Sequence, residues 1–291
     1  MMDQTAKLKL AQRGAYVSLI TYILLSIMKY SVGFIFDSAA MRADGLNNMT
    51  DIIVSLAVII GLKISIIPAD KNHPYGHLKS ENISTLVVSF IIMFVGIQVV
   101  IENVPRLFTH ETHVPSAITI YTSILSGIVM LLVYIYNKRL AAKTKSSSLS
   151  SAAKDNLSDG LVSIGTAVGL IFTQFGLPII DTILAVGLGL LIVYTGFGIF
   201  KESIFTLSDG FNKQELEAYK EEVAQVEGVI RVQSIKGRYH GSSVFVDVSI
   251  IVKADITLEA AHQICDQVER HMHKVGVTSI YVHPEPDSML E

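Results

Sequence analysis

Six apolar segments constrain this chain more than any other feature, because each is close to the length of a membrane-spanning helix. A helix needs about 20 apolar residues to cross the hydrocarbon core of a bilayer. The composition agrees, since 17% of the 291 residues are charged, against about 25% in soluble domains. We therefore expect an α-helical membrane protein with six transmembrane helices. The segments run over Ala15–Phe36, Ser38–Ile66, Ile83–Val104, Ser116–Asn137, Ser148–Phe175 and Pro178–Phe200.

Charged residues at the ends of these segments predict the orientation. An even number of spans places both termini on one side, and lysines and arginines gather there, whereas the opposite side has mainly Arg42 and Arg106. By the positive-inside rule, both termini are cytoplasmic. We expect a multi-pass protein of the cell (plasma) membrane. The net charge of −3 gives no reason to expect a nucleic-acid partner.

The C-terminal part of the chain has the pattern of a soluble domain. Residues 212–228 and 257–276 have helical spacing, and residues 229–240, 242–252 and 278–286 alternate as strands do. The order αββαβ is sufficient for a small α+β domain with helices packed on one sheet. We therefore predict two domains: a membrane domain of six helices over residues 1–206, and a cytoplasmic domain over residues 207–291.

Two short windows in the second and fifth segments resemble each other and carry the chemistry. They are NNMTDIIVS, which begins at Asn47, and DNLSDGLVS, which begins at Asp155. Within each window the first and fifth residues share one helical face. If the two faces meet, Asn47, Asp51, Asp155 and Asp159 offer one amide oxygen and three carboxylates. Such similarity between corresponding spans indicates a binding site near the middle of the membrane.

Carboxylates inside a membrane need a counter-charge. They are costly to bury unless they are paired or bind a cation, and three converging carboxylates would accept protons when no cation is bound. Metal–proton exchange therefore has a physical basis here. The alternative is that these polar groups only hold helices together by hydrogen bonds. Asp44 is a separate case, because Lys29 lies at a similar depth and predicts a structural ion pair.

The ligand types favour manganese. Carboxylate and amide oxygens suit harder cations, whereas imidazole and thiolate favour zinc or copper. The four predicted ligands include no histidine and no cysteine. Mn²⁺ fits best among the transition metals and Fe²⁺ comes next. Ca²⁺ takes about six to eight oxygens, which is more than four small ligands readily supply.

Taken together, these features make the chain resemble the cation diffusion facilitator family. Six spans, the paired motifs, the αββαβ domain and the loop sequence PADKNHPYGHLKSE carry the resemblance. It implies a homodimer with ferredoxin-like C-terminal domains that exports divalent metal in exchange for protons. It also places the transport site on the four ligands named above, in the pattern of the manganese-exporting bacterial branch.

The resemblance implies further sites outside the spans. Asp70, His73 and His77 have a spacing suited to a metal site in a loop. The equally weighted alternative is that His77 and Lys79 only cap and anchor the third span. Lys79 and Asp209 match a structural ion pair of the family between the spans and the soluble domain, and a solvated surface pair is the alternative.

In the C-terminal domain the chain departs from the zinc-type pattern. Gln233 and Ser249 occupy positions where zinc-type members have histidine. His262, His283 and Glu285 remain at matching positions, so a single weaker site is one expectation and no site is the other.

Several functions fit these features. The first is an antiporter that exports Mn²⁺ against protons by alternating access. The alternatives are an exporter of Zn²⁺, Fe²⁺ or Co²⁺ in the same family, an uncoupled divalent cation channel, and a membrane-anchored metal sensor. An enzyme is not expected, because the sequence has no Gly-rich phosphate loop, nucleophile elbow or HExxH motif. No cofactor is expected either, since the metal would be the substrate.

Overall fold

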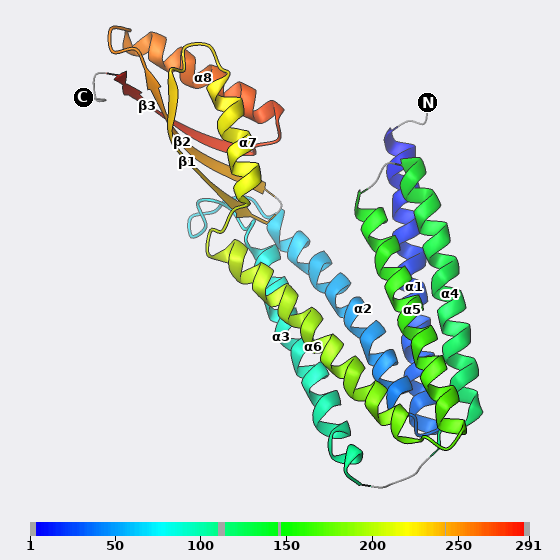
Figure 1. The fold of residues 1–291 in the computed structure, drawn as a ribbon. Helices are drawn as coiled ribbons and strands as arrows, with labels where there is room; N and C mark the ends of the chain where they lie inside the picture. Colours follow the sequence, from blue (N-terminus) through cyan, green and yellow to red (C-terminus); the bar gives the residue numbers. More distant parts are fainter. Residues whose placement is uncertain (1–3, 110–113, 145–146, 242, 288–291) are drawn as a thin grey trace. The chain divides into compact units, whose positions relative to one another are not determined.

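The computed structural model describes residues 4–109, 114–144, 147–241 and 243–287. Its residues form two compact units, and Figure 1 labels the helices and strands that compose them. The helical unit comprises Met1–Leu56 and Val88–Gly198, and the mixed unit comprises Ala57–Val87 and Ile199–Glu291. Most of the long helices therefore belong to the helical unit. The mixed unit contains the C-terminal elements together with the ends of three long helices.

Six long helices confirm the predicted spans. They are α1 (Gln4–Ile35), α2 (Ala39–Ser65), α3 (Ser80–Asn103), α4 (Ala117–Thr144), α5 (Ser147–Gln174) and α6 (Ile179–Leu207), with a short 3₁₀ turn η1 (Pro105–Leu107) after α3. Each contains a stretch long and apolar enough to cross a membrane. The α5 stretch is the most enclosed, since 50% of it is buried, against 28–33% in the other five. That enclosure explains why α5 can carry more polar residues than the other spans.

Small residues let some of these helices approach backbone to backbone. A Cβ atom on Gly96 of α3 would lie 2.8 Å from the carbonyl oxygen of Gly189 and 2.8 Å from the amide nitrogen of Val193, both on α6. No side chain fits at such a distance. Close packing at small residues is a common way to associate helices in a membrane, where apolar burial gives little driving force.

A carboxylate from another helix closes the N-terminus of α2. Asp181, in the first turn of α6, accepts hydrogen bonds from Ser38 Oγ (2.6 Å), Ala39 N (2.7 Å) and Ala40 N (3.2 Å). Amides in the first turn of a helix have no partner within the helix, and a negative charge is favourable there. Asp181 therefore fixes where α2 begins, and with it the depth of the polar window about two turns further along.

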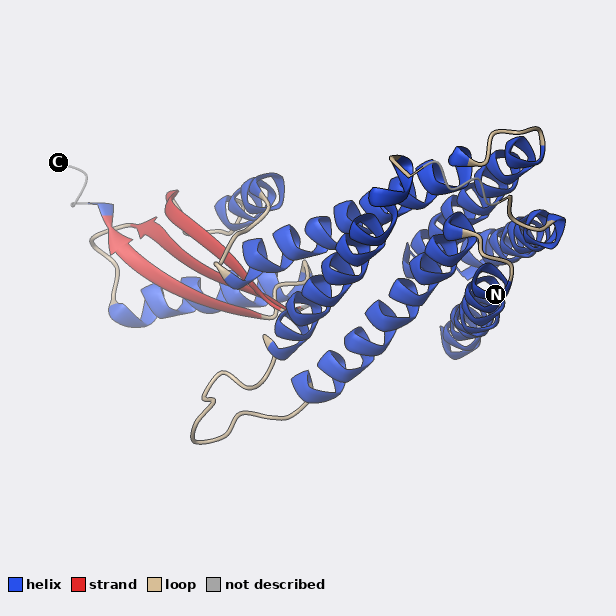
Figure 2. Ribbon diagram, turned by 90° about the horizontal axis from the view of Figure 1, so that it is seen from below, coloured by secondary structure: helices blue, strands red, loops and turns tan. Residues whose placement is uncertain are grey.

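The C-terminal elements confirm the predicted αββαβ order. They are α7 (Lys213–Ala224), β1 (Arg231–His240), β2 (Ser243–Val252), α8 (Leu258–Lys274) and β3 (Ser279–Pro286). The strands form one sheet with β2 in the centre, antiparallel to β1 and parallel to β3 (Figure 2). The fold is therefore a helical membrane protein with a C-terminal α+β domain, as predicted.

The alternation of β2 produces the core of this domain. Val246, Val248 and Ile250 are buried and alternate with less buried residues along the strand. They pack in one cluster with Val223 of α7 and Val268 of α8, so both helices cover the same face of the sheet. The helices begin at side-chain caps, since Asn212 caps α7 and Thr257 caps α8.

Candidate metal centre

The structure brings one predicted ligand from each polar window into contact. Asn47 of α2 donates a hydrogen bond from Nδ2 to Oδ1 of Asp159 on α5, at 3.1 Å. Since an amide has its donors on nitrogen and its acceptor on oxygen, this contact leaves Oδ1 of Asn47 available as a ligand. The faces of α2 and α5 therefore meet at these two residues.

Asp51 contributes an oxygen with no hydrogen-bond partner among the described residues. Its Oδ2 atom is buried and makes no hydrogen bond there. A buried oxygen of this kind is costly unless a cation or a proton compensates it. The chemistry of this position therefore suits a cation.

Asp155 is the most accessible of the four predicted ligands. It is exposed, whereas Asp159, one turn further along α5, is buried. Within the part of the chain that the structure describes, the three carboxylates do not form a group whose ligand atoms all lie within 4.8 Å of one another. Like charges repel at such distances, so bringing all three together requires a compensating cation.

Two residues on α1 complete the polar environment, and only one was expected from the sequence. Tyr22 donates a hydrogen bond from its hydroxyl to Oδ2 of Asp159, at 2.7 Å. Sequence reasoning missed Tyr22, because one tyrosine in an apolar span gives no periodic or repeat signal. Both oxygens of Asp159 are thus held, one by Tyr22 and the other by Asn47.

The expected partner of Asp44 is present and does more than pair with it. Lys29 is fully buried, and its Nζ donates to Asp44 Oδ1 at 3.0 Å, Asn48 Oδ1 at 2.7 Å and Ser163 Oγ at 2.8 Å. An ammonium has three donors, so all of them are used. Lys29 therefore links α1 to α2 and α5. Asn48 lies in the first of the two matched windows and Ser163 in the second.

The loop before α3 holds three potential ligands in one cluster. Atoms of Asp70, His73 and His77 all lie within 4.8 Å of one another. Asp70 Oδ1 accepts hydrogen bonds from the amides of Asn72 (2.8 Å) and His73 (2.7 Å). The hydrogen bond from the His73 amide is the main cause of a lowered pKa of Asp70. The carboxylate thus stays ionised, and His77 Nδ1 is buried without a hydrogen-bond partner in the described chain.

Contacts near this loop join the ends of α3 and α6 to the C-terminal sheet. Lys79 Nζ lies 3.0 Å from Asp209 Oδ1, and this hydrogen bond lowers the pKa of Asp209. Asn82 donates to Thr206 Oγ1 at 2.8 Å and accepts from Gly241 N at 2.9 Å. Both ion-pair residues are partly exposed, so the pair adds little stability by itself.

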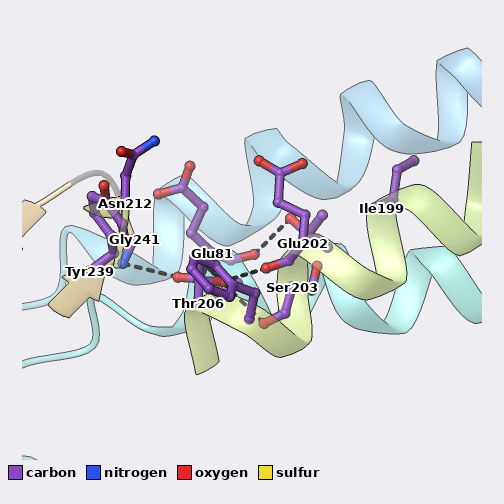
Figure 3. Close-up of a pocket in the computed structure, with 11 residues that line it drawn as sticks. Glu81, Ile199, Glu202, Ser203, Thr206, Asn212, Tyr239 and Gly241 are labelled. Atoms are coloured by element: carbon purple, nitrogen blue, oxygen red, sulfur yellow. Dashed lines mark hydrogen bonds between the residues drawn. The ribbon is translucent and has the colours of Figure 1, made fainter. Parts of the chain in front are cut away.

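A pocket of about 500 Å³ lies beside these contacts (Figure 3). Glu81 of α3 and Glu202 of α6 contribute carboxylates to its lining, and Tyr239 of β1 contributes an aromatic ring. Burial and the neighbouring Glu215 carboxylate raise the pKa of Tyr239 to about 12. None of the predicted metal ligands lines this pocket.

The predicted C-terminal ligands do not converge within one chain. His262 is exposed on α8, with Nε2 at 3.7 Å from Asp266 Oδ1. His283 and Glu285 are two residues apart on β3 and thus share a face of the sheet, where His283 pairs with Ser249 of β2. In the described ranges, the loop cluster is the only group of three acidic, histidine or cysteine ligands within 4.8 Å.

The polar groups that α2 and α5 present to each other are of the kinds that bind cations. They combine amide and carboxylate oxygens from two helices, and these are the ligands of hard divalent ions. No nucleophile–base pair is among them. A cation bound there would compensate carboxylates that hydrocarbon otherwise disfavours.

Comparison with known proteins gives matches over nearly the whole chain. Residues 15–208 match the family described as Cation efflux transmembrane domain, and residues 211–287 match the family described as Cation efflux protein, cytoplasmic domain. The chain is 46% identical over 286 residues to the Manganese efflux system protein MneS of Bacillus subtilis. This match covers 98% of this chain and 99% of that protein.

Two further relatives match most of the chain. The chain is 43% identical over 289 residues to the Uncharacterized transporter YdbO of Bacillus subtilis, covering 99% of this chain and 100% of that protein. It is 31% identical over 257 residues to the Magnetosome protein MamM of Magnetospirillum gryphiswaldense, covering 87% and 81% respectively. The similarity thus extends over the spans and the C-terminal domain alike.

Proposed function

The chain belongs to the cation efflux family, and on that premise we propose that it exports Mn²⁺ from the cytoplasm in exchange for protons. It is a multi-pass membrane transporter for metal efflux. The observation that carries the manganese proposal is the contact between Asn47 and Asp159. On the same helix as Asn47, a buried oxygen of Asp51 has no hydrogen-bond partner within the described chain. The similar protein MneS, named for manganese efflux, supports the same metal.

The ligand set supports manganese over zinc. We propose Asn47, Asp51, Asp155 and Asp159 as the transport site, which would bind the metal through oxygen atoms alone. Zn²⁺ is more often held by nitrogen and sulfur, whereas Mn²⁺ accepts carboxylate and carbonyl oxygens.

Charge balance supports proton exchange. When the metal leaves, three carboxylates remain inside the membrane, and protons from the outside can neutralise them. When metal returns from the cytoplasm it displaces those protons. Exposure of the site to one side at a time would couple the two fluxes by alternating access. We place both termini in the cytoplasm of a cell (plasma) membrane, because the lysines and arginines gather on that side.

We also propose roles for the parts outside the spans. Residues 1–206 would form the transport domain, and residues 207–291 would join two copies as a homodimer. His262 of one copy could then approach His283 and Glu285 of another, which one chain alone does not bring together. Light scattering of the purified protein measures this assembly, and a monomeric mass would contradict it.

Transport by the protein in proteoliposomes tests the main proposal. Vesicles that contain a pH-sensitive dye receive Mn²⁺, Zn²⁺, Fe²⁺ or Co²⁺ in turn. We expect proton movement with Mn²⁺, its loss in Asp159→Ala, and a shift toward Zn²⁺ in Asn47→His, because imidazole is a better zinc ligand.

Three outcomes would contradict parts of this proposal. A response to Zn²⁺ in the wild type that equals the response to Mn²⁺ would refute the argument from oxygen ligands. Metal movement without protons would indicate a channel. Normal Mn²⁺ transport by Asp159→Ala would refute the assignment of the transport site to the membrane-spanning helices.

A further inference from the structure

Tyr22 occupies an unusual position on α1. Other aromatic residues of this helix, such as Tyr16 and Phe34, are 64% and 67% exposed, as expected for side chains that face lipid. Tyr22 is 8% exposed, and its hydroxyl lies between two polar groups of α5. It donates to Asp159 Oδ2 at 2.7 Å and accepts from Asn156 Nδ2 at 3.1 Å.

The residues behind Tyr22 determine the direction of its hydrogen bond. Oδ1 of Asn156 accepts from Ser18 Oγ at 2.9 Å and from Asn137 Nδ2 at 2.9 Å. The amide group of Asn156 must therefore point its nitrogen toward Tyr22. Because the Tyr22 oxygen accepts from that nitrogen, its single hydrogen is left for Asp159. Ser18, Asn137 and Asn156 are all buried, so water does not compete for these contacts.

This network fixes the orientation of one carboxylate. Tyr22 holds Oδ2 of Asp159 and Asn47 holds Oδ1, so rotation of the carboxylate would break a hydrogen bond at either end. Hydrogen bonds between buried groups are strengthened by the low local dielectric, so these contacts resist such a rotation. A metal can then approach Asp159 only along the lone pairs that these two donors leave free.

We propose that Tyr22 is a positioning residue, which sets the orientation of Asp159 and thereby the affinity and selectivity of the site for the transported metal. The inference rests on the proposed function, in that Asp159 must be a ligand. Groups that hydrogen-bond to metal ligands commonly change metal affinity or activity by about 10- to 100-fold when they are mutated. Tyr22 does not itself bind the metal, and acts only through the carboxylate.

The test is Tyr22→Phe in the full-length protein, reconstituted in proteoliposomes. We expect the KM for Mn²⁺ to rise by about 10- to 100-fold, with a smaller change in the maximal rate. We also expect the preference for Mn²⁺ over Zn²⁺ and Co²⁺ to fall, because a mobile carboxylate tolerates more geometries. Tyr16→Phe is the matched control on the same helix, and its kinetics should equal those of the wild type.

A second variant separates positioning from folding. Ser18→Ala removes a distant contact of the network but keeps the hydrogen bond from Tyr22 to Asp159, so its KM should stay closer to the wild-type value. Where Tyr22→Phe transports too slowly for kinetics, calorimetry of Mn²⁺ binding to the purified protein replaces them, and weakened binding is the expected result.

Two results would overturn the inference. One is a Tyr22→Phe protein with wild-type KM, Mn²⁺ binding and metal preference. The other is a lowered unfolding temperature with unchanged binding and preference, which would make Tyr22 purely structural. Asp159→Ala distinguishes the two proposals: if it is inactive while Tyr22→Phe behaves as the wild type, only the inference about Tyr22 fails.

Discussion

Replacing Lys29 by methionine would leave a buried carboxylate without its counter-ion. Methionine keeps much of the length of the side chain but removes all three hydrogen bonds of the ammonium, to Asp44, Asn48 and Ser163. Both Lys29 and Asp44 have fully buried side chains. Removing one partner of a buried ion pair costs about 3–5 kcal/mol, because the other charge remains buried and uncompensated.

The magnitude falls at the upper end of this range for a structural reason. Oδ2 of Asp44 already has no hydrogen-bond partner among the described residues, so the carboxylate would have little to stabilise it after the ammonium is gone. Each neutral acceptor that loses a donor adds a further cost of about 1 kcal/mol. With about 5 kcal/mol for the ion pair and about 1 kcal/mol for each of Asn48 and Ser163, we expect the free energy of unfolding to fall by about 7 kcal/mol.

Denaturant unfolding of the purified protein in detergent measures this change. The matched control is Lys201→Met, since Lys201 is an exposed lysine on α6, and it should be nearly neutral. Adding Asp44→Asn to Lys29→Met removes the uncompensated charge and should recover at least half of the loss. The reasoning is refuted if Lys29→Met is as stable as Lys201→Met, or if the double variant is no more stable than the single one.

Two further predictions concern the mixed unit. Burial lowers the pKa of His240, and the charges of Lys79 and Arg238 lower it further against an opposing effect of Asp209. The neutral ring therefore favours the folded state: its contribution is full above the unfolded pKa of about 6.5 and is lost as the pH falls through the lower folded pKa. Unfolding measured from pH 8 to pH 5 should show a steeper loss in the wild type than in His240→Gln, and parallel curves would contradict this. In the loop cluster, we propose a second divalent site, so Asp70→Ala should reduce the Mn²⁺ bound per chain in equilibrium dialysis while Asp209→Ala should not. Equal binding by Asp70→Ala and the wild type would leave the loop histidines as structural groups only.

The fold followed from the sequence where the signal is local. Segment length and low charge predict the six spans, and the strict alternation from Val246 to Ile250 predicts a half-buried strand. The caps of α7 and α8 are likewise encoded within a few residues. By contrast, the cap that Asp181 places on α2 joins residues far apart in the chain. No local pattern indicates which helix end will meet which side chain.

Of the candidate site, the sequence indicates only the residues that we propose as ligands. The repeat of polar windows identified Asn47 and Asp159, and the structure brings these two into contact. The sequence repeat could not identify Tyr22 or Asn137, because their importance depends on how α1 and α4 pack against α5. Lys29 was an intermediate case: the sequence indicated its ion pair with Asp44, but its two other hydrogen bonds depend on packing.

The close approach of α3 and α6 has a mechanical consequence. Since the backbone of Gly96 touches that of Gly189 and Val193 with no room for a methyl group, these two helices cannot slide past each other without a collision. The two helices are fixed to each other at this point. A rearrangement that opens the other side of the membrane must therefore move α3 and α6 together. Relative motion is then left to helix pairs without such contacts. Gly96→Ala would test this, because the added methyl group would force α3 and α6 apart while every proposed metal ligand is retained.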